Sequence, residues 1–93
     1  MQSRSGGAMF TYAVPEKGKV GLKVVDMSGD LVCVLIPPRT TVTATGVPRQ
    51  VAWRGENSAG RFAGAGLYVY IFTYTPDASG KTITLRKPIG LIY

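Results

Sequence analysis

The chain is short and basic: its 93 residues carry 11 lysines and arginines against five aspartates and glutamates, with no histidine and one cysteine. This length fits one small domain. The absence of histidine excludes a Ser-His-Asp triad, a Cys-His dyad and an ordinary zinc site, and a single cysteine forms no internal disulfide. Hydrophobic residues make up 45% of the chain, which indicates a folded domain and not a disordered one.

The N-terminal residues differ in composition from the rest of the chain. Met1–Ala8 is polar and glycine-rich, which predicts a flexible leader, and residues 9–93 form the single predicted domain. No window of this domain keeps the apolar spacing of an amphipathic helix, whereas strand patterns recur. In chain order, strands are predicted at Met9–Val14, Lys19–Asp26, Leu31–Ile36, Gln50–Trp53, Leu67–Tyr74, Lys81–Leu85 and Ile89–Tyr93.

Proline and glycine set the expected ends of these strands. The two prolines at 37 and 38 are expected to end the third strand, so that Arg39–Pro48 forms a loop or an irregular edge. Arg54–Gly66 holds four glycines and no strand pattern, which predicts an ordered loop. Pro88 favours an edge position or a bulge. About seven short strands separated by turn signals predict an all-β antiparallel sandwich, with a small barrel as the alternative.

Three segments carry a resemblance to a known family: Tyr12–Asp26, Asp26–Leu35 and Trp53–Tyr70. In their spaced glycine, proline and aromatic positions they resemble the immunoglobulin-like domain of the flagellar hook-capping protein and its relatives among bacterial surface and secreted proteins. The resemblance covers roughly Phe10 to Ile92. It implies a sandwich of the immunoglobulin or fibronectin-III type that serves assembly, anchoring or spacing, and not catalysis.

One set of residues is predicted to determine the fold. The Trp53 ring is expected to pack under the glycine-rich loop, where Asn57 can close an Asx turn and Gly60 can supply a positive φ. Tyr68 is expected to pack inward with its hydroxyl bonded to the backbone. The family usually has aspartate after the tryptophan, whereas this chain has Arg54, so the loop is expected to be held differently. The predicted fold-determining residues are Trp53, Gly55, Asn57, Gly60, Gly66 and Tyr68.

Two of the predicted strands, Leu31–Ile36 and Leu67–Tyr74, are apolar on both faces. Such a strand is normally covered on both sides, whereas a two-layer sandwich covers only one. Strand curvature or covering loops are one interpretation. The favoured interpretation is that the outer face is buried against another subunit, because two separate strands share the pattern. The predicted protein-contact residues are Cys33, Val34, Ile36, Tyr70, Phe72 and Tyr74.

No catalytic, cofactor-binding or metal site is predicted. Gly80-Lys81-Thr82 resembles the end of a phosphate-binding loop, but position 75 is threonine where that motif needs glycine. The formal net charge of +6 is spread along the chain and attracts acidic protein surfaces, anionic lipid headgroups or nucleic acid. Nucleic acid is a less favoured partner, because the aromatic strand lacks the basic start of an RNA-binding motif.

The sequence therefore predicts a non-catalytic structural or assembly module without a cofactor. It is expected to be an accessory subunit that docks onto the protein subunits of a larger assembly, with an anionic membrane surface as a further contact. The alternatives are a C-terminal anchoring or sorting module of a secreted or surface protein, and a basic nucleic-acid-binding domain. No secretory signal or membrane-spanning run is found. The sequence does not specify a compartment: a full-length chain is expected to be cytoplasmic or peripheral to a membrane complex, and an excised module is expected to be extracellular or periplasmic.

Overall fold

The computed structural model describes residues 8–91, and this part of the chain forms six strands and no helix. Within it there is accordingly no helix that could span a membrane. The predicted leader lies outside the described residues except for Ala8, which begins the first strand. The strands are β1 (Ala8–Tyr12), β2 (Gly18–Asp26), β3 (Leu31–Val42), β4 (Arg49–Trp53), β5 (Gly66–Pro76) and β6 (Ile83–Leu91).

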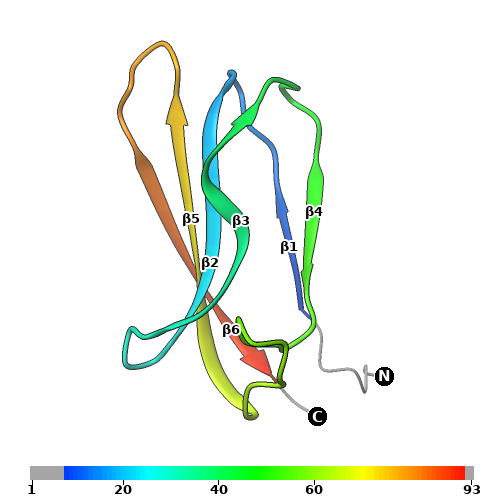
Figure 1. The fold of residues 1–93 in the computed structure, drawn as a ribbon. Helices are drawn as coiled ribbons and strands as arrows, with labels where there is room; N and C mark the ends of the chain where they lie inside the picture. Colours follow the sequence, from blue (N-terminus) through cyan, green and yellow to red (C-terminus); the bar gives the residue numbers. More distant parts are fainter. Residues whose placement is uncertain (1–7, 92–93) are drawn as a thin grey trace.

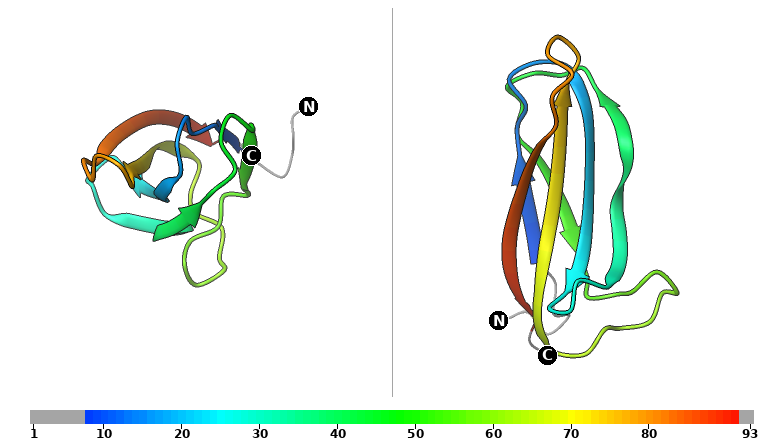
Figure 2. Two further views of the ribbon diagram at one scale, coloured as in Figure 1. Left: turned by 90° about the horizontal axis from the view of Figure 1, so that it is seen from above. Right: turned by 90° about the vertical axis from the view of Figure 1, so that its left-hand side faces the viewer.

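The strands form two antiparallel layers, which confirms the predicted all-β sandwich (Figure 1). One layer is a four-stranded sheet in the order β3-β2-β5-β6, and the other contains β1 and β4. Figure 2 shows β1 and β4 lying across one face of the larger sheet. The sheet's opposite face, called the outer face below, is covered by no other strand of residues 8–91.

The strand count is six where about seven were expected, because the last two predicted strands are one. β6 runs through Pro88, which pairs with Val69 of β5. Since β6 is the edge of its sheet, the missing proline N–H removes no bond to a further strand. The predicted segment Ile89–Tyr93 extends past the described residues at positions 92 and 93.

The prolines at 37 and 38 do not end β3, so the predicted end of the third strand is wrong, and the first four residues of Arg39–Pro48 form the irregular edge that was the alternative to a loop. β3 continues because it bulges: residues 37–39 stand opposite the single residue Gly21 of β2. Arg39 takes a positive φ of 63° within this bulge. A Cβ atom at Gly21 would lie 3.1 Å from the Pro38 Cα atom, so glycine lets the bulged edge strand stay close to β2.

Aromatic side chains fill the space between the layers. The Phe10 ring of β1 contacts the rings of Tyr70 and Phe72, with centroids 5.1 and 5.3 Å apart. Trp53 from β4 packs edge-to-face on Tyr68 at 5.2 Å. The core consists of Phe10, Val14, Val20, Leu22, Val24, Cys33, Val42, Trp53, Tyr68, Tyr70, Phe72 and Tyr74.

The hydroxyl of Tyr70 is buried without a hydrogen-bond partner among residues 8–91. By contrast, the Tyr68 hydroxyl donates to the Gly64 carbonyl, and the Tyr74 hydroxyl donates to the Glu16 carbonyl at 2.7 Å. Burial, with a smaller electrostatic contribution from Cys33, raises the pKa of Tyr70 to about 12.

Replacing Tyr70 with phenylalanine is expected to raise the free energy of unfolding by up to about 1 kcal/mol, because an unsatisfied polar group leaves the core.

The folded wild type holds the Tyr70 proton more tightly than the unfolded chain does. The part of the free energy of unfolding that depends on Tyr70 keeping its proton is fully present below pH 10 and is lost as the pH rises toward about 12. Urea unfolding measured between these pH values should show a smaller fall in the free energy of unfolding for Tyr70→Phe than for the wild type. Equal falls for the two proteins would contradict the raised pKa of Tyr70.

Candidate docking surface

The outer face of the four-stranded sheet has a central row of four side chains, one from each strand. Val34 of β3 pairs with Lys23 of β2, Lys23 pairs with Ile71 of β5, and Ile71 pairs with Arg86 of β6. Directly paired residues of antiparallel strands point to the same face, with Cβ atoms about 4.5–5.5 Å apart. The row therefore alternates an apolar residue with a cation across the whole sheet.

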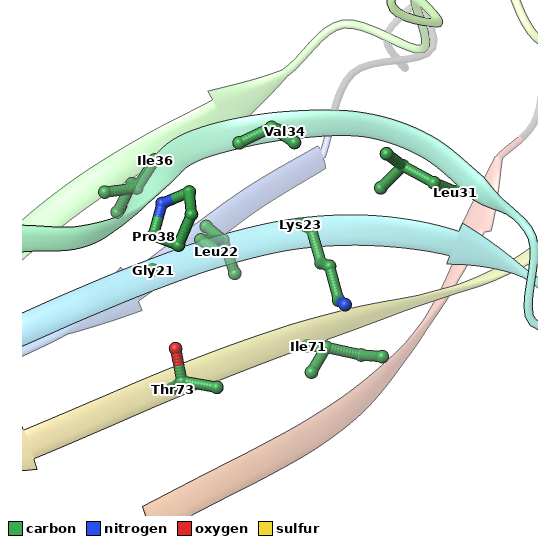
Figure 3. Close-up of a pocket in the computed structure, with 9 residues that line it drawn as sticks. All are labelled: Gly21, Leu22, Lys23, Leu31, Val34, Ile36, Pro38, Ile71 and Thr73. Carbon is green, nitrogen blue, oxygen red and sulfur yellow. The ribbon is translucent and has the colours of Figure 1, made fainter. Parts of the chain in front are cut away.

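A shallow groove of about 360 Å³ runs along this face between β3 and β5. Figure 3 shows Leu31, Val34 and Ile36 on the β3 side, with Lys23 reaching from β2 toward Ile71. Leu31 and Val34 are 56% and 45% exposed, so two large apolar side chains of the groove face solvent. The lining residues are Gly21, Leu22, Lys23, Leu31, Val34, Ile36, Pro38, Ile71 and Thr73.

The bulge in β3 and the glycine beneath it shape this groove. Gly21 has no side chain to fill the space between Pro38 and Thr73, and an added Cβ atom would lie 3.1 Å from the Thr73 Oγ1 atom. The hollow thus forms where Gly21 of β2 lies opposite the proline-containing bulge of the edge strand β3.

Two of the six predicted contact residues, Val34 and Ile36, line the groove. The other four are placed wrongly by the sequence argument, because the structure buries them between the layers. Side chains alternate along a strand, so Cys33 points opposite to Val34, and the aromatic set of β5 points opposite to Ile71. The buried four are Cys33, Tyr70, Phe72 and Tyr74.

The contact residues predicted from the sequence did not include the groove residues Gly21, Lys23, Leu31 and Ile71, or their neighbour Arg86. The available signal was the alternation in β2, where Val20, Leu22 and Val24 point inward and leave Gly21 and Lys23 outward. Arg86 is found only through the pairing of β5 with β6.

The loop between β4 and β5 is built as expected at three positions. The Asx turn is present, because the Asn57 Oδ1 atom accepts the N–H groups of Ala59 and Arg61 at 2.9 and 3.0 Å. Gly60 has a φ of 81°. The Trp53 Nε1–H donates to the Glu56 carbonyl at 2.8 Å.

Other members of the predicted fold-determining set also lie in or beside this loop. Gly55 has a φ of 88°, Gly66 begins β5, and Tyr68 is buried. The loop is further tied to β3, because the Ser58 N–H and hydroxyl both donate to the Val32 carbonyl, at 2.9 and 3.1 Å. That these residues determine the fold stays a prediction, which the Trp53 substitution below tests.

The described residues contain no group of three or more histidine, cysteine, aspartate or glutamate side chains that could hold a metal ion. The Cys33 thiol lies in the core, and burial raises its pKa, which keeps it in the unreactive thiol form at neutral pH. The chemical features of the outer face are therefore its apolar groove and the exposed cations Lys23 and Arg86.

The fold resembles solved structures of the hook-capping protein FlgD. A crystal structure of FlgD from Xanthomonas campestris, described in connection with hook capping in flagellar assembly, is 26% identical, with a TM-score of 0.64. It covers 90% of this chain and 57% of its own. FlgD from P. aeruginosa is 20% identical, with a TM-score of 0.68, and covers 95% of this chain and 64% of its own.

These similarities confirm the resemblance predicted from the sequence: the chain is similar to FlgD over most of its length. It spans less than two thirds of the length of either solved FlgD chain. No family model matches the sequence, and no curated protein matches it.

Proposed function

We propose, from the FlgD-like fold and the groove on the outer face, that this domain is a non-catalytic assembly module. It docks onto the protein subunits of a larger complex through the groove that contains Val34 and Ile71. One of the similar structures is a hook-capping protein of flagellar assembly, and by that likeness the complex is proposed to be a flagellar or related bacterial assembly.

The observation that carries this proposal is the exposure of apolar side chains in a concave part of the outer face. Leu31 and Val34 are 56% and 45% exposed, and both line this hollow. Exposed apolar groups that gather in one hollow mark interaction sites, whereas singly scattered ones do not. The cations of the central row provide long-range attraction toward an acidic surface.

The experiment is thiol labelling of Val34→Cys in the free domain and in the complex isolated from its source. Rapid labelling is expected in the free domain and slow labelling in the complex, because the groove is covered there. Val47→Cys is the matched control: Val47 is 50% exposed, lies outside the groove, and should label equally in both states. The wild type sets the background, because its one cysteine is buried. Equal labelling of Val34→Cys in both states would refute the docking role.

A further inference from the structure

The two cations of the central row lack acidic partners within the described residues. Lys23 and Arg86 flank Ile71 on either side, and the ion pair recorded within residues 8–91 joins neither of them, since it links Lys19 to Asp77 at 3.9 Å. Both cationic side chains are exposed. Their charges are therefore available to a ligand that contacts Ile71.

Carboxylates are absent from the middle of this face. All five acidic side chains of the chain lie among the described residues, in turns and loops or at a strand end. They are Glu16, Asp26, Asp30, Glu56 and Asp77. The outer face thus has apolar and basic side chains at its centre and its acids at the ends of the strands.

We propose that the groove binds an acidic amphipathic segment of a partner protein. Apolar side chains of that segment pack against Val34 and Ile71, and its carboxylates pair with Lys23 and Arg86. The inference rests on the proposed docking function and adds the chemistry of the partner. Charge-assisted contacts beside an apolar anchor give specificity as well as attraction.

Charge argues against one other occupant, and shape argues against a second. A second copy of this chain, related by a two-fold axis, would place the basic centre of one outer face against an identical basic centre, which is repulsive. A membrane surface is flat and contacts protruding side chains, whereas Val34 and Ile71 belong to a concave groove (Figure 3). A protein segment can enter the groove with single side chains.

The test is selection from a displayed library of random short peptides on the folded domain. Peptides enriched on the wild type should combine apolar residues with an excess of aspartate and glutamate. On the double variant Lys23→Glu/Arg86→Glu, the acidic peptides should bind at least about tenfold more weakly, and the selection should turn to lysine- and arginine-containing peptides. A change in charge preference, unlike a loss of binding, does not follow from unfolding.

The matched control is Arg49→Glu/Lys81→Glu, which makes the same change in net charge at exposed positions outside the groove. It should select the same acidic peptides as the wild type. The proposal is overturned if no peptide is enriched, if the enriched peptides carry no acidic excess, or if both double variants behave alike. It is also overturned if charge reversal at Lys23 and Arg86 abolishes binding to phosphatidylcholine–phosphatidylserine vesicles while no peptide is selected.

The peptide selection and the labelling of Val34→Cys test the acidic partner and the docking function separately. If Val34→Cys is protected in the complex but the peptide selection shows no charge preference, the docking function stands and the acidic partner is wrong. If Val34→Cys is not protected in the complex, the docking function fails, and the proposed partner fails with it.

Discussion

Replacing Trp53 with alanine is expected to lower the free energy of unfolding by about 3–5 kcal/mol. The side chain is only 2% exposed and is among the largest fully buried ones. Its removal leaves a cavity beside the Tyr68 ring and deletes the hydrogen bond from Nε1 to the Glu56 carbonyl. Since small domains have a total stability of about 5–15 kcal/mol, the variant should be mostly or wholly unfolded at moderate urea concentrations.

Urea titrations of the wild type, Trp53→Ala and Trp53→Phe measure this effect. Phenylalanine keeps an aromatic ring against Tyr68 but lacks the N–H donor, so its loss of stability should lie between those of the other two proteins. A free energy of unfolding that falls from the wild type to Trp53→Phe to Trp53→Ala would support Trp53 as the residue that joins β4, its loop and β5. An unchanged midpoint for Trp53→Ala would refute the predicted role of this residue in the fold.

The all-β sandwich and most of its strands could be predicted from the sequence, because strand patterns and turn residues act locally. The alternation in Lys19–Asp26 appears as β2, with Val20, Leu22 and Val24 in the core. The glycine-rich loop and its Asx turn at Asn57 are likewise encoded within a few residues. The edge position expected for Pro88 is confirmed, but β6 is one strand and not two, and β3 continues past the prolines at 37 and 38. Proline is tolerated at sheet edges, and which strand forms an edge depends on pairing between distant strands.

The candidate surface was predicted only in part, and the physical reason lies in β5. Both faces of that strand are apolar, so alternation defines two sets of residues without showing which set points inward. The structure buries the aromatic set, because the Phe10 ring from the smaller layer contacts Tyr70 and Phe72. The row from Val34 to Arg86 depends on the pairing of all four strands, which no local pattern specifies.

Replacing Val34 with glutamate is expected to reduce partner binding at least about tenfold while leaving the domain folded. The new carboxylate would place a charge in the apolar groove and stand directly opposite Lys23, whose attraction for an acidic partner it would offset. Because Val34 is 45% exposed, the fold itself should lose no more than about 1 kcal/mol. Val47→Glu introduces the same charge at a 50% exposed valine outside the groove.

The most direct measurement is therefore a quantitative comparison of the proteins that co-purify with the tagged wild type, Val34→Glu and Val47→Glu from the native source. Docking through the outer face predicts that the proteins recovered with the wild type and Val47→Glu are absent or strongly reduced with Val34→Glu. Equal recovery with all three folded domains would contradict the account and show that this groove is not where the complex is held.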